Sequence, residues 1–147
     1  MKHVEKNKNP LSLPTSFSYT IEGTPVPLAR ARHGMGRTYD SQKKLKFSCG
    51  LQLQSQHNGL PLILGPLKLE VVFFLHIPSG LRLDLIQGIY GTPHDTRPDL
   101  SNLIKYIEDV ATGIIYKDDS QISIIIANKI FSAIPRTEFT ITRLDVE

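Results

Sequence analysis

The stretch TRPDLSNLIKYIEDVATGIIYKDDSQI, residues 96–122, decides the fold of this 147-residue chain. At about 100° per residue, its apolar side chains fall within one arc of roughly 120°, which predicts an amphipathic helix from residue 99 to about residue 112. Pro98 disfavours helical geometry at the residue before it, so Asp99 is expected at the cap or in the first turn. The next segment, SQISIIIANKIFS (120–132), is typical of a strand. The stretch therefore predicts a helix and a strand, each preceded by aspartate.

Three further segments have the pattern of strands. SFSYTIEG (16–23) and TEFTITRLDV (137–146) alternate apolar and polar residues, as half-buried strands do. LKLEVVFFLHI (67–77) is too continuous in apolar residues to have one wet face, which predicts a central strand. The short sequence IPRT between the last two strands predicts that they form a hairpin.

A second helix is predicted over QKKLKFSCGLQLQSQH (42–57), although Gly50 weakens the pattern. Residues 28–42 before it are expected to form a loop rich in arginine. Residues 78–98 have three glycines, three prolines and no period, so a long loop is expected there. Loops of that length are typical of functional sites.

The resulting order of elements is β-α-β-α-β-β, with two main helices and a mixed sheet of about four strands. This order predicts a small α/β or α+β domain. We expect it to span residues 16–147, after a flexible polar tail at residues 1–15.

Composition is typical of a soluble globular protein, with 40% apolar and 21% charged residues. No apolar run reaches the length of about 18 residues that a membrane span needs. The N-terminal sequence has no apolar core of a secretory signal. A single cysteine, Cys49, allows no internal disulfide. We therefore expect a cytoplasmic protein with no membrane segment.

Charge is unevenly distributed along the chain. Residues 1–57 contain nine Lys and Arg against three Asp and Glu, whereas residues 58–147 contain eight against eleven. A basic first part suits the phosphates of a polyanion, and an acidic second part suits cations. Nucleic-acid enzymes that bind cations combine both features, although an ordinary solvated surface explains such an imbalance equally well.

Asp99, the Asp118–Asp119 pair and Lys105 are the candidate chemical groups of the deciding stretch. Asp99 also fits an ordinary N-cap, and the aspartate pair fits a turn before a strand. Lys105 also fits a solvated helix lysine paired with Asp109. Their combination in one segment favours a catalytic role over these structural ones. Phosphodiester cleavage needs divalent cations held by carboxylates and a positive charge near the phosphate.

The two acidic positions can converge in two ways. A helix from residue 99 to about residue 112 is roughly 20 Å long, and residues 113–118 span about 20 Å when fully extended. A return along the helix is therefore just possible within one chain. Alternatively, two subunits meet so that the aspartate pair of one approaches Asp99 of the other. The sequence leaves both arrangements open.

The stretch GTPHDTRPDLSNLIKYIEDVATGIIYKDDSQI (91–122) resembles the signature region of RusA-type endodeoxyribonucleases, the Holliday-junction resolvases often found in prophages. The pattern of that family is D-[LI]-D-N-L-x-K, a short helix, and D-D-x-Q before a strand. This chain is similar to it in the D-x-x-N-x-x-K and D-D-x-Q spacings. GTPVPLARARHGMGRTY (23–39) is similar to the family's G-x-P turn, arginines and tyrosine, so the resemblance covers most of the chain.

The resemblance implies a homodimeric hydrolase that uses Mg²⁺, or Mn²⁺, to make paired nicks in a four-way DNA junction during recombination and repair. Carried over by position, the family's metal-binding aspartates fall on Asp99 and Asp119, with Asp118 beside the latter. The functional lysine falls on Lys105, and the asparagine of the motif falls on Asn102.

Ser101 departs from the family pattern, which has an aspartate at this position. Serine coordinates a hard cation only weakly and removes one negative charge from the pocket. Asp95 is a candidate to compensate, and Glu108 is a weaker one because it lies nearly two turns further along. The alternative function is a catalytically weak or inactive protein that binds junction DNA. A metal nuclease acting on flaps or forks is a third possibility.

Basic residues outside the motif are expected to bind DNA phosphates without sequence preference and with a steep dependence on salt. Arg97 is close enough to Asp99 in sequence to contact the scissile strand, although it also fits a structural ion pair. His94, beside Asp95, is considered as a supporting polar group. The expected DNA-binding residues are Arg30, Arg32, Arg37, Lys43, Lys44, Lys46, Arg97 and Asn102.

Overall fold

A computed structural model describes residues 13–30, 32–34 and 36–145 of the chain. Most of the predicted tail, residues 1–12, therefore lies outside the described residues. Residues 13–15, the described end of that segment, lie beside the end of the sheet. The Arg143 N–H donates a hydrogen bond to the carbonyl of Thr15 at 2.8 Å.

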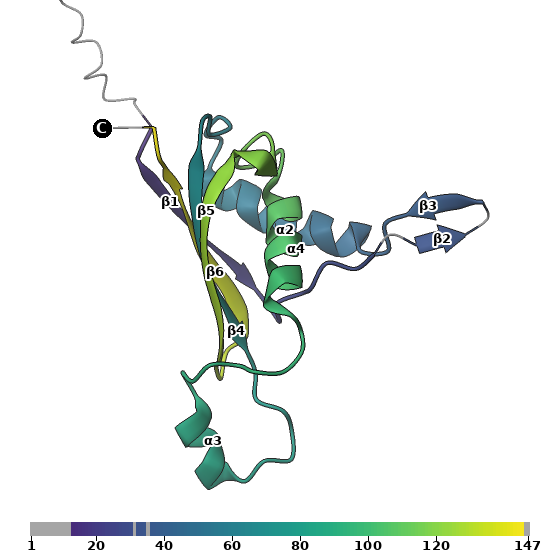
Figure 1. The fold of residues 1–147 in the computed structure, drawn as a ribbon, viewed down its shortest axis with the longest axis vertical. Coiled ribbons are helices and arrows are strands. Elements are labelled where there is room, and N and C mark those ends of the chain that lie inside the picture. Colours follow the sequence, from purple (N-terminus) through teal and green to yellow (C-terminus); the bar gives the residue numbers. More distant parts are fainter. Residues whose placement is uncertain (1–12, 31, 35, 146–147) are drawn as a thin grey trace, which may run out of the picture.

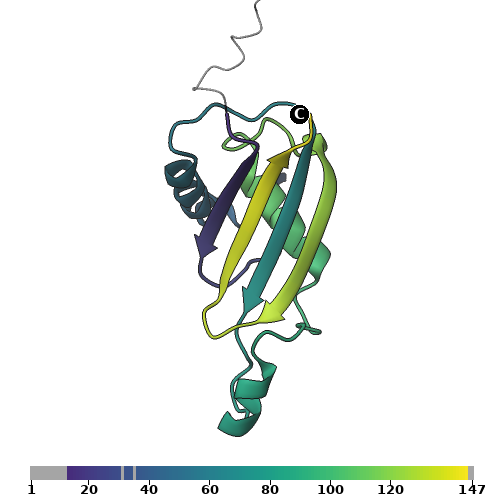
Figure 2. The same ribbon diagram turned by 90° about the vertical axis from the view of Figure 1, so that its left-hand side faces the viewer.

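A mixed four-stranded sheet forms the centre of the fold (Figures 1 and 2). Its strands are β1 (Ser16–Glu22), β4 (Leu67–Leu75), β5 (Ile122–Phe131) and β6 (Arg136–Arg143), in the spatial order β1-β6-β4-β5. Strands β4 and β5 are parallel, and the other neighbours are antiparallel. The predicted α+β class with a mixed sheet is confirmed, and β4 is an interior strand as predicted.

Helices α2 (Lys43–His57) and α4 (Leu100–Ala111) cover one face of the sheet and leave the other open (Figures 1 and 2). The short helix α3 (Leu83–Ile89) projects from one end of the sheet. The hairpin of β2 (Arg32–Gly34) and β3 (Arg37–Tyr39) projects beyond α2. A 3₁₀ turn, η1 (Asp119–Gln121), precedes β5. Among the described residues, no helix has the length and apolar character needed to cross a bilayer.

The hairpin predicted between the last two strands is wrong. Strand β6 lies between β1 and β4, so β4 separates it from β5. The reason is the connection through α4, which returns the chain to the starting end of the sheet and makes β5 parallel to β4. Strand β6 then pairs with β4 and β1 along nearly its whole length.

The two predicted loops are only partly irregular. Residues 28–42 contain the hairpin β2–β3, and residues 78–98 contain α3. Neither element has the periodicity of a long helix or strand, because each is short and packs little against the core.

The core lies between the covered face of the sheet and the two helices. The apolar stripe predicted for α4 is buried at Leu103, Ile107, Val110 and Ala111. Tyr106 extends this stripe towards α2, and its hydroxyl lies 3.6 Å from the Cys49 sulfur. Cys49 is therefore a packing residue, as predicted. Its contact with Tyr106 joins α2 to α4, and both helices also pack against the sheet.

Helix α2 buries fewer of its predicted apolar positions. Leu45 and Leu51 are exposed, while Leu53 is fully buried. Gly50 is buried as well, and a Cβ atom there would lie only 3.1 Å from the Ile114 side chain. The glycine that weakened the helix prediction thus allows the segment after α4 to approach α2 closely.

A buried hydrogen-bonded pair joins β1 to the end of α2. His57 Nε2 donates to the carbonyl of Pro61 at 2.9 Å, so its Nδ1 accepts from the hydroxyl of Tyr19 at 2.7 Å. Both side chains are less than 5% exposed. Burial raises the pKa of the Tyr19 hydroxyl to about 12.

Replacing Tyr19→Phe is expected to lower the free energy of unfolding by about 1–3 kcal/mol, because His57 Nδ1 is left buried without a donor. Urea denaturation at neutral pH measures this loss. The difference from wild type should shrink as the pH rises from about 10 towards 12, where the unfolded tyrosine ionises first. The matched control is Tyr39→Phe at an exposed tyrosine, and an equal loss in both variants contradicts the assignment.

Candidate active site

Asp99 occupies the N-cap of α4, with extended backbone angles of φ −66° and ψ 137°. Its carboxylate makes no capping hydrogen bond, although the position would allow one. The side chain is exposed and lines a hollow of about 450 Å³ together with Pro27, Arg97, Pro98 and Asn102. The helix therefore begins where predicted, but its stability does not depend on this carboxylate.

Asp118 and Asp119 are adjacent in sequence but differ in what they do. The carboxylate of Asp118 accepts the backbone N–H of Ser120 at 3.0 Å and also its hydroxyl. These bonds, the hydroxyl first, hold the pKa of Asp118 below its usual range. The Gln121 side chain in turn accepts the Asp118 N–H, which completes a capping box at η1. Asp119 is exposed, and its carboxylate has no hydrogen bond within the described part of the chain.

Asp99 and Asp119 lie at opposite ends of α4. The helix has 12 residues and is about 18 Å long. After it, the chain turns at once, with the Gly113 N–H bonded to the Tyr116 carbonyl at 2.7 Å and the Tyr116 hydroxyl bonded to the Glu108 carbonyl at 3.0 Å. Gly113 has a φ of +84°, which favours glycine at this turn.

Strand β5 gives an independent measure of the same separation. Asp119 directly precedes β5, and the Lys129 ammonium near its other end donates to the Pro98 carbonyl at 2.7 Å. The seven intervals from Ile122 to Lys129 span roughly 23 Å. The return of the chain along α4, one of the two arrangements considered from the sequence, therefore does not occur in the structure.

Glu108 lies near the end of α4 and interacts electrostatically with Asp119, not with Asp99. Burial raises the pKa of Glu108, the negative charge of Asp119 raises it further, and Lys105 lowers it. Lys105 and Glu108 thus lie on α4 within electrostatic reach of each other, and Asp119 lies beyond the end of the helix within reach of Glu108. The short connection after α4 was the signal that the second acidic position stays near the end of the helix.

Ser101 and Asp95 are both exposed. Across the described residues, neither side chain has a hydrogen bond or an ion pair that joins it to Asp99. His94 is buried, and its ring packs against Phe131 at a tilt of 47°, with centroids 4.7 Å apart. Burial, then the charge of Lys129, lowers the pKa of His94. The supporting roles suggested for these residues stay predictions.

The basic hairpin leaves the body of the protein beside Asp99. The Leu28 N–H donates to the Asn102 carbonyl in α4 at 2.9 Å, and the Gln42 amide bridges Ala29 and Pro27 at the base of the hairpin. We call residues 28–44 the basic arm. Its backbone places Arg32 and Arg37 in β2 and β3, while their side chains lie outside the described atoms. The exposed side chains of the arm include Arg30, Lys43 and Lys44.

Lys46 has a structural contact that the sequence did not indicate. Its ammonium lies 2.7 Å from the carboxylates of both Asp40 and Asp109. Asp109 is thus paired with Lys46 of α2, and not with Lys105 as considered from the sequence. The predicted role of Lys46 in DNA binding stays a prediction beside this role in joining α2 to α4.

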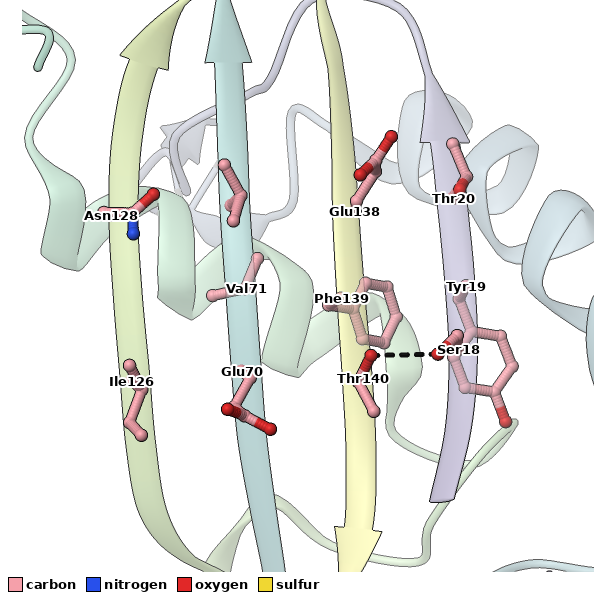
Figure 3. A pocket seen from close by; sticks show the side chains of 11 residues that line it. Ser18, Tyr19, Thr20, Glu70, Val71, Ile126, Asn128, Glu138, Phe139 and Thr140 are labelled. Atoms are coloured by element: carbon pink, nitrogen blue, oxygen red, sulfur yellow. Dashed lines mark hydrogen bonds between the residues drawn. The ribbon is translucent and has the colours of Figure 1, made fainter. Parts of the chain in front are cut away.

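A second hollow lies on the open face of the sheet (Figure 3). This trough of about 460 Å³ is lined by side chains of all four strands, including Ser18, Glu70, Ile126 and Thr140. It contains none of the residues predicted to bind metal or DNA.

The oxygen donors suit a hard cation, but one chain does not close a site around it. Free, exposed carboxylates are the ligands that Mg²⁺ prefers. Among residues 13–30, 32–34 and 36–145, no group of three His, Cys, Asp or Glu side chains lies close enough together to hold a metal ion. The carboxylates are therefore of the chemical type that binds Mg²⁺, but the described residues of one chain do not bring enough of them together to hold the ion.

An enzyme that acts on nucleic-acid phosphates needs carboxylates for a divalent cation and basic groups for the phosphates. This α+β domain has exposed carboxylates at both ends of α4, Lys105 between them and a basic arm beside Asp99. Comparison with known families agrees, since the profile of endodeoxyribonuclease RusA matches residues 22–142. The chain belongs to the RusA endodeoxyribonuclease family. This membership implies endonuclease activity on DNA. The chain is also similar to the uncharacterised protein YqaN of Bacillus subtilis (strain 168), at 29% identity over 136 residues, which covers 85% of this chain and 94% of that protein.

Alanine substitutions of Asp118 and Asp119 are expected to differ in their effect on stability. Asp118→Ala should lower the urea midpoint at pH 7, because the turn before β5 loses its cap. Asp119→Ala should leave the midpoint unchanged. Since the pKa of Asp118 is lowered by folding, its contribution is present above about pH 3.8 and is lost as the pH falls below that value. Midpoints measured at pH 7 and pH 3 check this, and an equal loss in both variants is the contrary result.

Proposed function

We propose that the protein is a divalent-metal-dependent endodeoxyribonuclease that resolves four-way DNA junctions by paired nicks, in recombination and repair of cytoplasmic DNA. Mg²⁺ is the proposed ion, with Mn²⁺ as a substitute. The observation that carries the proposal is the pair of exposed carboxylates, Asp99 and Asp119, which have no hydrogen-bond partner among the described residues and lie at opposite ends of α4 in a chain of the RusA family.

Two copies of the chain are proposed to complete each site. Because α4, a helix about 18 Å long, separates Asp99 from Asp119 in one chain, a shared ion needs Asp99 from one copy and Asp119 from the other. Glu108, which lies near Asp119, is a further oxygen donor on that side. A two-fold axis would create two such sites, one for each of two symmetric nicks.

The residues of the chain have separate proposed roles. Lys105, exposed between the two carboxylates, would offset negative charge on the phosphate. Arg97 and Asn102 line the hollow beside Asp99 and would position the scissile strand. A bound divalent cation would supply Lewis acidity for phosphodiester hydrolysis. The remaining proposed phosphate contacts are Arg30, Arg32, Arg37, Lys43, Lys44 and Lys46.

Mixing two inactive variants is the test of this function. Asp99→Asn and Asp119→Asn should each abolish nicking of a labelled four-way junction in Mg²⁺, because each variant removes one donor from both sites. In a mixed dimer, one site regains both aspartates and the other has neither. Random exchange of subunits should therefore restore about a quarter of the wild-type nicking, as single nicks and not pairs.

The control mixes Asp119→Asn with the double variant Asp99→Asn/Asp119→Asn, which cannot rebuild a site and should stay inactive. An active wild type with no recovery in the first mixture would show that the sites are not shared between copies. A wild type that shifts the junction in a gel without cutting it supports the alternative, an inactive junction-binding protein. Flap and fork substrates in the same assay test the preference for four-way junctions.

Ser101→Asp tests the departure from the family pattern. Ser101 is exposed in the first turn of α4, two residues after Asp99. An added carboxylate there should bind the cation more tightly and lower the Mg²⁺ concentration needed for half-maximal nicking. Ser101→Asn, which has the same shape without the charge, is the control. An unchanged Mg²⁺ dependence in both variants would mean that this position does not face the ion.

A further inference from the structure

A third hollow adjoins the one that contains Asp99. Its volume is about 480 Å³, and it shares Pro27, Arg97 and Pro98 with the hollow of Asp99. We call it the His94 hollow, because His94 lies on its wall. The turn after β1, the end of β4 with the residues that follow it, and the segment before α4 supply the other lining residues, which include Thr24, Pro25, Leu75, His76 and Pro78. A group bound here therefore lies next to a group bound beside Asp99.

His94 is the buried polar side chain of this hollow. It is 8% exposed, and its Nδ1 is buried without a hydrogen-bond partner among the described residues. Nε2 is therefore the ring nitrogen that is left to meet a ligand. A buried nitrogen without a partner costs stability, whereas an apolar ring against Phe131 would not. Packing alone thus gives no reason for a histidine at this position.

The charge state of His94 limits what it can bind. Burial, and next the charge of Lys129, hold the pKa of His94 below the ordinary value, so the ring is uncharged at pH 7. The Nε2 atom of an uncharged imidazole donates or accepts one hydrogen bond, according to the tautomer. Such a group suits the edge of a nucleobase, which presents both donors and acceptors.

The walls of the His94 hollow suit a flat, neutral ring. Four prolines and Leu75 give it apolar surface. Pockets that receive an extruded nucleobase combine apolar or aromatic walls, on which the base stacks, with a few groups that hydrogen-bond to its edge. His94 and the hydroxyl of Thr24 are groups of the second kind. None of the described residues that line the hollow is acidic, so it does not offer the ligands of a hard divalent cation.

A phosphate group fits this hollow less well than a base. Phosphates are bound by cations and by several N–H donors, whereas the ring of His94 is neutral. The ammonium group of Lys129 donates to two backbone carbonyls of the segment before α4. Arg97 is exposed where the two hollows meet, so it can bind a phosphate beside Asp99. The two hollows thus differ in the chemistry that they offer to a DNA strand.

We propose that the His94 hollow receives one nucleobase of the scissile strand, next to the phosphate that lies beside Asp99, and that His94 hydrogen-bonds to the edge of that base. The inference rests on the proposed function, because it takes the phosphate beside Asp99 to be the one that is cut. Extruding a base costs least where its pairing or stacking is already interrupted, as it is at the branch point of a junction. The enzyme then nicks fastest where the accepted base flanks the cut.

Junctions that differ only in the base pair beside the cut test the inference. The positions at which the wild type nicks a four-way junction in Mg²⁺ are mapped first, and each of the four bases is then placed next to the cut. The nicking rates of the wild type should differ by about tenfold between the best and the poorest base, the discrimination that one hydrogen bond to a base edge supplies. This ratio compares substrates of one protein, so a loss of stability alone does not change it.

His94→Phe and Tyr90→Phe are the matched variants for this assay. His94→Phe keeps an aromatic ring against Phe131 but has no ring nitrogen, so the difference between the bases should largely disappear. Tyr90→Phe changes an exposed tyrosine of the same segment, outside the hollow, and should leave the difference unchanged. A wild type without a preference, or the same preference in wild type and His94→Phe, would overturn the inference while the nuclease function stands.

A binding assay tests the hollow without cutting, and covers the case that His94→Phe does not fold. The fluorescent base 2-aminopurine, whose emission rises when it leaves the base stack, is placed at successive positions around the branch point of a junction bound in Ca²⁺. One position should give a rise with the wild type. Thr24→Phe, which fills the hollow from an exposed position, should remove that rise, and Thr24→Ser should keep it.

The outcomes separate this inference from the proposed function. A rise that Thr24→Phe removes, in a protein that nicks no junction, keeps the base-binding hollow and removes the nuclease function. Nicking without a rise at any position, or a rise that Thr24→Phe leaves unchanged, contradicts the base-binding hollow and keeps the nuclease function.

Discussion

The rigidity of α4 is the constraint on which the rest of the structure depends. Its apolar stripe packs against the sheet, so it cannot bend without exposing the core. Both of its ends are held by hydrogen bonds, through Lys129 at Pro98 and through Tyr116 at Glu108. The two acidic positions are therefore kept apart by a fixed length. A chain that needs both of them around one ion has to obtain one from elsewhere, and the identical site of a second copy is the simplest source.

The fold was predictable where the signal is local and periodic. The stripe of α4 and the alternation in β1 and β6 each arise within about ten residues, so the sequence alone was sufficient to identify them. Pairing of strands is not local, and the wrong hairpin between β5 and β6 shows this. A short connection normally joins neighbours, but here the parallel crossover had already placed β4 between them. The element α3 was missed because its seven residues are too few to establish a period.

The site was predictable in position and not in detail. Spacing correctly placed Asp99 at the helix start and an aspartate pair before β5. It did not show that Asp118 accepts hydrogen bonds from Ser120 while Asp119 has no hydrogen bond among the described residues. It likewise gave no sign that Lys46 is shared between two carboxylates, because Asp109 belongs to a different helix. The Lys46 contact joins distant segments, whereas the difference between Asp118 and Asp119 arises within the local turn before β5.

The two borders of the sheet show how the same physical problem is solved differently within one fold. A border strand exposes unpaired N–H and C=O groups, which lose little while water reaches them but can pair with another strand. Beside β1, Gln56 and Gln52 accept the N–H groups of Thr20 and Glu22, near the end of the strand. Beside β5, the segment 91–94 covers only the end, and isoleucines surround what remains. Isoleucine is costly on a surface and favourable in a paired strand. Ile124, Ile125 and Ile126 of β5 therefore stay exposed at this border in the described chain.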